Sequence, residues 1–155
     1  QAAPYLSAAD LQVVHLAGER DVETVQSAYT AAGVPAAVLP FCDRMQEVYP
    51  AADLAISRSG AASLGELSWF GLPSLLVPFP YAAEDHQRLN AEIFTRVGAA
   101  SMLAEKEATG ESLSRLLISL LESPQSLTTM AAAAKALAPR DAAARVAAVL
   151  AEVKS

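Results

Sequence analysis

A turn of small residues at positions 57–66 carries the residue types that could bind a nucleotide. Gly60, Ala61 and Ala62 stand between two short apolar runs, and Glu66 follows them. If a helix begins in this turn, its free backbone N–H groups and the positive end of its dipole would face an anionic group. The small side chains would let a phosphate reach the backbone. Glu66, one to two turns into the helix, could accept two hydrogen bonds from a ribose diol, so the turn predicts a nucleotide site.

The same residues also allow a purely structural interpretation. Small residues are common where a strand turns into a helix. In addition, Ser63 and Glu66 have the spacing of a capping box, in which the serine accepts from the Glu66 N–H and the glutamate reaches back. Taken alone, the turn is compatible with either interpretation.

The elements that would position the turn alternate along the chain. Apolar runs bounded by turn residues predict strands at 11–16, 36–39, 54–57, 74–77 and 99–103. Helical patterns ending at glycine or proline predict helices at 21–32, 43–50, 62–70 and 85–97, followed by three alanine-rich helices at 110–122, 125–138 and 140–153. Such alternation predicts a single α/β domain over residues 1–155, with a Rossmann-like parallel sheet and helices on both faces. Ligands gather at the carboxyl ends of strands in such sheets, and the turn begins there.

Two further segments follow the predicted strands before and after the turn, and they make its functional interpretation more specific. Upstream lies Pro40-Phe41-Cys42-Asp43, and downstream lies the stretch 77–91, which contains His86, Gln87 and Asn90. The three segments together closely resemble the donor-binding half of the peptidoglycan N-acetylglucosaminyltransferases of the MurG type. The resemblance runs from about His15 to the end of the chain and is strongest between Phe41 and Ala91. It implies the C-terminal half of a GT-B glycosyltransferase, from a family that uses UDP-N-acetylglucosamine to convert lipid I to lipid II.

The resemblance implies roles for individual residues. The aromatic side chain at the position of Phe41 lies at the uracil in the family, and the backbone of the next residue, Cys42, reads the base edge. Glu66 resembles the ribose-binding glutamate, and the turn resembles the loop on the phosphate side. His86 and Gln87 stand where the family places two polar residues against the sugar hydroxyls, although some members have two glutamines there. The predicted substrate-binding residues are Phe41, Cys42, Ser59, Gly60, Ala61, Ala62, Ser63, Glu66, His86, Gln87 and Asn90.

Several of these residues have structural alternatives. Phe41 ends an apolar run and by default would belong to the core. His86 at the start of a polar helix could be solvated or form a cap, and Asn90 could either orient its neighbours or be exposed. Arg58 could pair with a phosphate or brace the loop, whereas His15 is expected to be structural.

The resemblance also shows what the chain lacks. No Asp-x-Asp triplet is present, so we expect no obligate metal, and no other cofactor is implied. The family's first strand of this domain, with its glycine-rich turn, has no counterpart, and Gln1 to Ala9 looks like the tail of the helix that follows that strand. The acceptor-binding half, which carries the family's general base, has no counterpart either. We therefore expect no catalytic residue in this chain and no transferase activity from it alone.

Composition limits the classes of partner that this chain could bind. The formal net charge of −6 argues against nucleic acid and against direct contact of this segment with an anionic membrane. No apolar run reaches the roughly 20 residues of a membrane span, and the single cysteine, Cys42, excludes an internal disulfide. The expected partners are UDP-N-acetylglucosamine and, through the missing half, a lipid-linked acceptor. The complete enzyme would act in the cytoplasm at the inner face of the bacterial membrane.

Two other functions remain open at the level of sequence. One is a non-catalytic nucleotide-sugar-binding subunit of a split glycosyltransferase. The other is a related transferase or epimerase of the same architecture. The sugar-nucleotide 2-epimerases share a turn of the Ser/Asp-Gly-Gly type that is followed by two consecutive glutamates, whereas here the turn is Ser59-Gly60-Ala61 and only Glu66 is present. That difference disfavours the epimerases.

Overall fold

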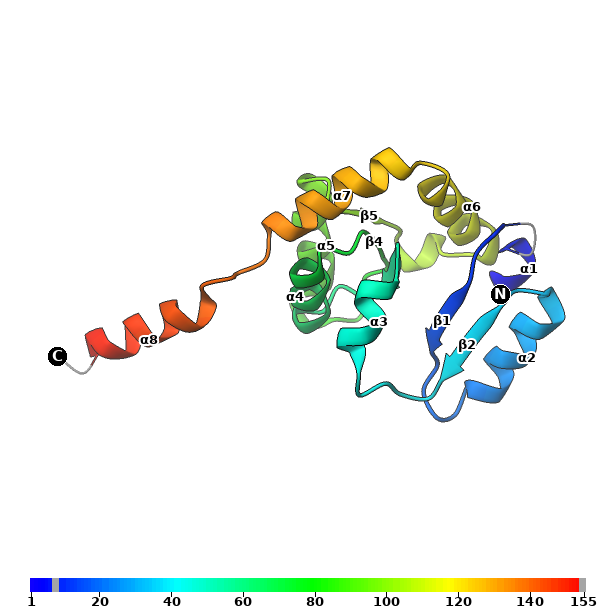
Figure 1. Ribbon diagram of the computed structural model, residues 1–155, viewed down its shortest axis with the longest axis horizontal. Helices are drawn as coiled ribbons and strands as arrows, with labels where there is room; N and C mark the ends of the chain where they lie inside the picture. The colour runs from blue at the N-terminus through cyan, green and yellow to red at the C-terminus, as the bar shows by residue number, and fades with distance from the viewer. Residues whose placement is uncertain (7–8, 154–155) are drawn as a thin grey trace.

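The computed structural model describes residues 1–6 and 9–153 (Figure 1). Its strands are β1 (Val13–Leu16), β2 (Ala36–Leu39), β3 (Ala55–Ser57), β4 (Ser74–Leu76) and β5 (Ala100–Met102). Its α-helices are α1 (Ala3–Leu6), α2 (Val22–Ala32), α3 (Met45–Ala51), α4 (Ala61–Phe70), α5 (His86–Arg96), α6 (Gly110–Leu121), α7 (Pro124–Ala136) and α8 (Ala142–Val153). Short 3-10 turns, η1 (Ala83–Asp85) and η2 (Glu105–Glu107), precede α5 and α6.

Every strand and long helix expected from the sequence is present, with small shifts at the ends. Asp43 does not cap α3, because the helix begins one residue after Arg44. Helix α1 falls within the predicted helix tail at the N-terminus, of which residues 7 and 8 lie outside the described residues. Gly71 ends α4 in the left-handed conformation at φ 66°. An added Cβ there would lie 3.2 Å from the Ala131 carbonyl oxygen, so this turn needs glycine both for its backbone angle and for the close approach of α7.

The strands pair in parallel, which confirms the Rossmann-like α/β fold class. β1 pairs with β2, and β4 lies between β3 and β5. The strands form two ladders and not one continuous sheet, because no ladder joins β1 to β3 among the described residues. A helix links each strand to the next, as parallel neighbours require.

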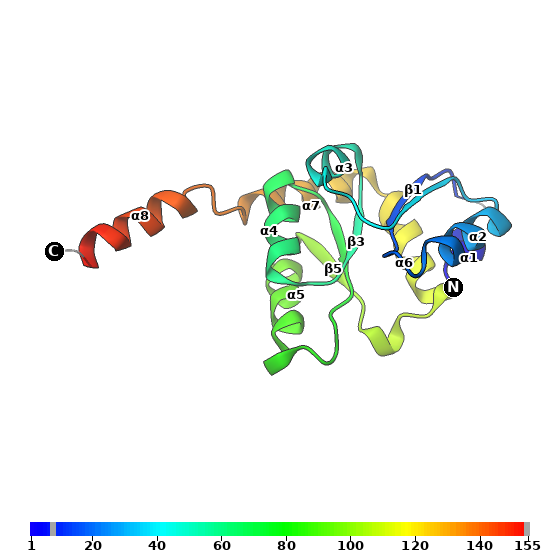
Figure 2. The ribbon, with the colours of Figure 1, turned by 90° about the horizontal axis from the view of Figure 1, so that it is seen from below.

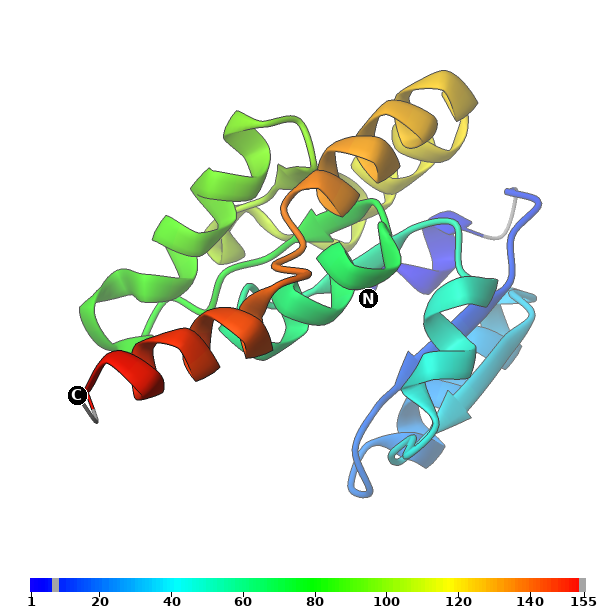
Figure 3. The same ribbon diagram turned by 60° about the vertical axis from the view of Figure 1, so that its left-hand side comes forward.

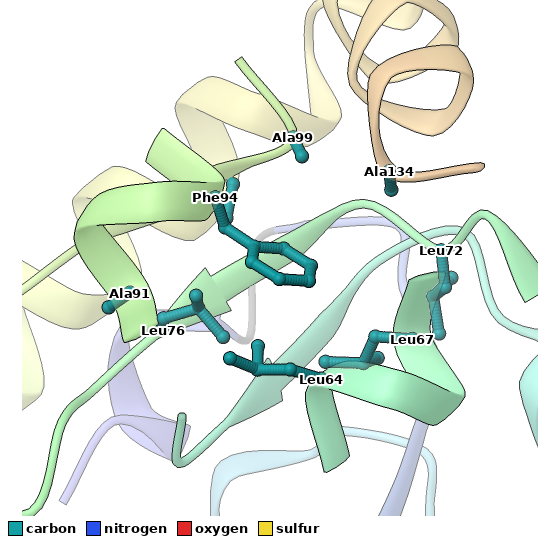
Figure 4. Packing of buried hydrophobic residues seen from close by; sticks show 9 residues of the cluster. Leu64, Leu67, Leu72, Leu76, Ala91, Phe94, Ala99 and Ala134 are labelled. Atoms are coloured by element: carbon teal, nitrogen blue, oxygen red, sulfur yellow. The ribbon is translucent and has the colours of Figure 1, made fainter. Parts of the chain in front are cut away.

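The main hydrophobic core lies between the β3–β4–β5 ladder and helices α4, α5 and α7. Leu64 and Leu67 of α4, Phe94 of α5 and Leu76 of β4 meet there (Figure 4). Ser74, Leu75 and Leu76 of β4 are all fully buried. Because alternate side chains of a strand point to opposite faces, both faces of β4 must be covered.

A second cluster packs helices α1, α2 and α6 together. Its buried residues are Leu6, Val34 and Leu117. The strands of the larger ladder lie between α4 and α5 on one side and α6 on the other, as Figure 2 shows. His15 of β1 bonds the Tyr29 hydroxyl of α2 at 3.1 Å and meets its ring edge-on, which is the structural role expected for it. Burial lowers the pKa of His15.

Helix α8 extends away from the rest of the chain (Figures 1 and 2). Its side chains Val146, Val149 and Leu150 are exposed. At the base of the connection, the Arg140 guanidinium lies 5.6 Å from the centre of the Trp69 ring. Across the described ranges, no helix is both long enough and apolar enough to cross a bilayer.

Candidate functional site

The predicted site residues follow the carboxyl ends of three strands. Phe41 and Cys42 follow β2, the turn at 58–60 follows β3, and the segment from Phe79 to Gln87 follows β4. Helices α4 and α5 begin in the second and third of these segments. The three loops thus all follow the carboxyl ends of parallel strands, which is where ligands bind in folds of this class. The turn at 58–60 and helix α5 are joined by hydrogen bonds, whereas Phe41 and Cys42 follow a strand of the other ladder.

Ser59 ties the turn after β3 to helix α5. Its side chain is fully buried, and its hydroxyl donates to the Gln87 carbonyl at 2.7 Å. The Asn90 side-chain amide donates to the Ser59 carbonyl at 3.1 Å. Asn90 is therefore not a free exposed amide, and it holds the turn in place. The Ser59 hydroxyl is already used in the fold, so any contact of this residue with a ligand would have to come from its backbone.

Helix α4 begins without a side-chain cap. Gly60 stands at the N-cap with extended backbone, and the next three residues, Ala61, Ala62 and Ser63, form the first turn. The N–H groups of a first turn have no partner within the helix. A Cβ built on Gly60 would meet nothing within 4 Å, so the space beside the backbone is open. Uncapped amides in open space suit an anionic oxygen.

The capping-box interpretation of Ser63 and Glu66 is wrong. A cap residue precedes the helix, whereas Ser63 lies inside α4 as its third residue. The Glu66 carboxylate is exposed and accepts from another helix. The carboxylate is therefore available at the surface beside the first turn of α4.

Tyr49 of α3 orients Glu66, and it was not among the residues predicted for the site. The Tyr49 hydroxyl donates to Glu66 Oε2 at 2.6 Å, and the tyrosine ring stacks on Phe70 at 5.2 Å between centroids. Burial first, and then the hydrogen bond and charge of Glu66, raise the pKa of Tyr49 to about 12. The tyrosine thus remains a neutral donor at physiological pH. One carboxylate oxygen of Glu66 is held, and the other can accept from a ligand.

We expect Tyr49→Phe to weaken UDP binding several-fold. The phenylalanine ring would keep the stacking on Phe70 but remove the hydrogen bond that fixes Glu66, a loss of about 0.5–1.5 kcal/mol. Calorimetric titration with UDP measures this change. Tyr29→Phe, which removes a tyrosine hydroxyl that bonds His15 away from the site, is the matched control and should bind UDP like the parent. Equal affinity in the Tyr49 variant and the parent would show that Tyr49 does not act through Glu66.

The raised pKa of Tyr49 also predicts how the stability of the protein depends on pH. Its hydrogen bond needs the neutral phenol, so its contribution to stability is complete below the ordinary tyrosine pKa of 10.0 and is lost as pH rises through about 12. The difference in melting temperature between the parent and Tyr49→Phe should therefore be constant up to pH 10 and should shrink above it.

Phe41 is a surface residue and not part of the core. Its side chain is 76% exposed, which overturns the default expectation for the end of an apolar run. The strand ends at Leu39, two residues earlier, so Phe41 already belongs to the loop. Cys42 beside it is half-buried. An exposed aromatic ring on a loop can stack on the face of a nucleobase.

His86 and Gln87 open helix α5, and local hydrogen bonds already hold both side chains. His86 Nδ1 donates to the Ala83 carbonyl at 2.6 Å, which leaves Nε2 for a ligand. Gln87 Oε1 accepts from the Phe79 N–H at 3.0 Å, which leaves its NH2 group. The preceding residues Glu84 and Asp85 have positive φ values of 52° and 55°. Left-handed backbone is costly for such residues, and it occurs more often at binding sites than elsewhere.

Arg58 braces the loop after β4. Its guanidinium donates to the carbonyls of Val77 and Pro78 at 3.1 and 3.3 Å, pairs with Glu105, and lies 5.5 Å from the centre of the Phe79 ring. The hydrogen bond from Arg58 lowers the pKa of Glu105. Of the two roles open to Arg58 from the sequence, the structure therefore supports bracing.

Two aromatic residues beside this loop were not predicted as part of the site. Phe79 and Tyr81 are 41% and 85% exposed and meet edge-on at 5.6 Å. The Pro-Phe-Pro-Tyr pattern marks a loop in the sequence, and the exposure of its two rings follows only from the fold.

A hollow of about 220 Å³ between α4 and α5 reaches two of the predicted site residues, Ala61 and Asn90. A hollow of about 380 Å³ lies between α3, α4 and α7, and its lining includes Tyr49, Leu72 and Pro73. Within residues 1–6 and 9–153, no three His, Cys, Asp or Glu side chains lie close enough together to hold a metal ion.

The parallel α/β fold, with loops that follow the carboxyl ends of its strands, defines a Rossmann-like domain. The chain belongs to the glycosyltransferase family 28 C-terminal domain family, whose sequence model matches residues 1–146.

Individual proteins similar to this chain carry a narrower description than the family model does. Over 153 residues, the chain is 45% identical to the UDP-N-acetylglucosamine–N-acetylmuramyl-(pentapeptide) pyrophosphoryl-undecaprenol N-acetylglucosamine transferase of Nostoc sp., covering 99% of this chain and 42% of that protein. The enzyme of the same name from Geobacter sp. is 42% identical, with 90% of this chain and 38% of that protein covered. The crystal structure of Acinetobacter baumannii MurG matches with a TM-score of 0.89 at 32% identity, covering 97% of this chain and 46% of that one. The chain thus spans less than half the length of these relatives.

Proposed function

We propose that residues 1–155 form the donor-binding domain of an inverting N-acetylglucosaminyltransferase. The complete enzyme would transfer N-acetylglucosamine from UDP to a lipid-linked N-acetylmuramyl-pentapeptide and so convert lipid I to lipid II at the cytoplasmic face of the membrane. The observation that carries the proposal is the pairing of Glu66, held by Tyr49 at 2.6 Å, with the uncapped amino end of the same helix. A carboxylate and free amides on one helix match a ribose diol and a diphosphate.

Each predicted residue has a role in this proposal. The ring of Phe41 stacks on the uracil, and the Cys42 backbone reads the base edge. Glu66 binds the ribose, and the backbone from Ser59 to Ser63 faces the diphosphate. His86 and Gln87 bind sugar hydroxyls through Nε2 and the free NH2 group, and Asn90 holds the turn to α5.

The proposed chemistry needs a second domain. The acceptor hydroxyl, deprotonated by a base outside this chain, forms a bond to the anomeric carbon as the bond from that carbon to the β-phosphate oxygen breaks. UDP leaves with the bonding electrons, and negative charge grows on the β-phosphate. The first-turn amides of α4 would stabilise that charge, since preorganised N–H donors act where charge develops.

A chimera tests the proposal as a whole. The chain alone should give no product from UDP-N-acetylglucosamine and lipid I. When these 155 residues replace the matched part of the Nostoc relative, the chimera should transfer labelled N-acetylglucosamine to the acceptor. Glu66→Ala in the same chimera serves as the control and should reduce transfer about tenfold or more. A chimera that folds and remains inactive, or product formed by the isolated chain, would overturn the proposal.

A further inference from the structure

A chain of contacts connects Glu105 to Gln87, the residue proposed to bind a sugar hydroxyl. Glu105 begins η2, the 3-10 turn that follows β5, and it was not among the residues predicted for the site. Its carboxylate pairs with the guanidinium of Arg58, which directly follows β3. The pair joins residues that are 47 positions apart, each on a segment that follows the carboxyl end of a strand. The segment after β5 therefore lies at the same edge of the larger ladder as the loops after β3 and β4.

Arg58 also holds the loop after β4. Its Nη1 group donates to the carbonyls of Val77 and Pro78 at 3.1 and 3.3 Å, and the guanidinium lies 5.5 Å from the centre of the Phe79 ring. The same nitrogen donates to Glu105. A free arginine side chain has many rotamers, and an acceptor that fixes the guanidinium removes that freedom. Glu105 is therefore placed to keep the guanidinium against the loop.

The loop after β4 in turn fixes the side chain of Gln87. The Phe79 N–H donates to Gln87 Oε1 at 3.0 Å, and the hydroxyl of Ser59 donates to the Gln87 carbonyl at 2.7 Å. Two connections thus run from the turn after β3 to Gln87. One passes through Ser59 to its backbone, and the other passes through Arg58 and the loop to its side chain. Both belong to the ladder of β3, β4 and β5, and the blue β1–β2 pair stands apart from it (Figure 3).

The pair of Arg58 and Glu105 is too exposed to be a major source of stability. The two side chains are 45% and 40% exposed, and exposed ion pairs contribute little to the free energy of folding. What Glu105 can change is the orientation of the guanidinium. Its removal should therefore leave the fold intact and alter the loop that Arg58 holds.

We propose that Glu105 is a positioning residue for the donor sugar, and that it acts by holding Arg58 against the loop after β4. Glu105 itself touches neither the nucleotide nor the sugar. Its effect reaches the ligand through the Phe79 N–H, which leaves the NH2 group of Gln87 directed at the sugar hydroxyls. This inference rests on the proposed function, because it takes Gln87 to bind the sugar of UDP-N-acetylglucosamine.

Glu105→Gln tests the inference, because it removes the charge and keeps the size of the side chain. The dissociation constant of UDP-N-acetylglucosamine divided by that of UDP should rise about threefold, with the UDP affinity and the melting temperature nearly unchanged. Calorimetric titration with both ligands measures this ratio. Glu107→Gln is the matched control, because it makes the same change of charge in the same 3-10 turn. That variant should bind both ligands as the parent does.

A double variant tests whether Glu105 acts through Arg58. Arg58→Met removes the donors and should raise the same ratio roughly tenfold. Adding Glu105→Gln to it should change the ratio no further, because two residues that act in one path are not additive. The Phe79 amide should exchange with solvent faster in each single variant than in the parent. If Arg58→Met does not fold, Arg58→Lys takes its place, because lysine keeps the charge and loses the planar donor group.

The outcomes separate this inference from the proposed function. An unchanged ratio in Glu105→Gln, in a chain whose parent binds both ligands, would overturn the inference and leave the proposed function standing. Tighter binding of both ligands by that variant would also overturn it, because Glu105 would then keep Arg58 from a phosphate. A parent chain that binds neither ligand would overturn the proposed function and this inference with it.

Discussion

Glu66→Ala is expected to weaken UDP binding about tenfold to a hundredfold while leaving the fold nearly intact. Losing hydrogen bonds to a charged group costs about 1.5–3 kcal/mol. The side chain is exposed, and its partner Tyr49 keeps its stacking on Phe70, so little packing is lost. Calorimetric titration with UDP and thermal melts on the same variant measure the two effects separately.

Glu111→Ala is the control for this prediction. Glu111 is also an exposed glutamate on a helix, α6, and it pairs with Arg115 away from the loops of the site. Its removal should leave UDP affinity unchanged. If Glu66→Ala lowers the melting temperature and binds UDP as the parent does, Glu66 is a structural partner of Tyr49 and does not bind ribose.

Replacing His86 and Gln87 together by alanine should weaken UDP-N-acetylglucosamine binding about tenfold more than UDP binding. Each residue offers one free polar group, and two neutral hydrogen bonds are together worth about 1–3 kcal/mol. The quantity to compare is the ratio of the two dissociation constants. A change in the ratio would show that the two side chains contact the sugar. An equal change in both constants would instead show that the substitution disturbs the loop that Gln87 holds through the Phe79 N–H.

Single variants distinguish contact with the sugar from support of the loop after β4. His86→Ala removes a free ring nitrogen and a bond to the Ala83 carbonyl, whereas Gln87→Glu keeps the acceptor for the Phe79 N–H and removes the NH2 group. Glu92→Ala, later on the same helix, should change neither constant. An unchanged ratio in the double variant would place the sugar elsewhere.

The order of elements was predictable because local signals mark it. Apolar runs give the strands, and Gly33 and Gly71 adopt the left-handed conformation that ends helices α2 and α4. The loops of the site follow from these boundaries, because each begins where a strand ends. The family resemblance then supplied the roles of the loop residues, which composition and periodicity alone could not.

Side-chain partners were not predictable, because they depend on contacts between distant parts of the chain. Tyr49 and Glu66 are 17 residues apart and meet only because α3 packs on α4. A shift of one or two residues in the start of a helix also changes a side chain's role. Because α4 begins at Ala61, Ser63 lies within it and not at its cap. The burial of Ser59 and the exposure of Phe41 follow from the same kind of tertiary detail.

The division of the strands into two ladders could not be predicted from the sequence pattern either. Periodicity identifies strands, but it does not state which strands pair. The residues of β1 and β3 look like ordinary apolar runs, and only the pairing shows that no ladder joins these two strands among the described residues.

Titration of the chain with UDP-N-acetylglucosamine, UDP-glucose and UDP, followed by NMR chemical shifts, tests the central claim most directly. We expect UDP-N-acetylglucosamine to bind more tightly than UDP-glucose, with the largest shifts at the backbone amides of Gly60 to Ser63 and at Cys42. Saturable shifts confined to the hollow beside Leu72 and Pro73, or no saturable binding of any of the three, would contradict the assignment of a donor site to the carboxyl ends of these strands.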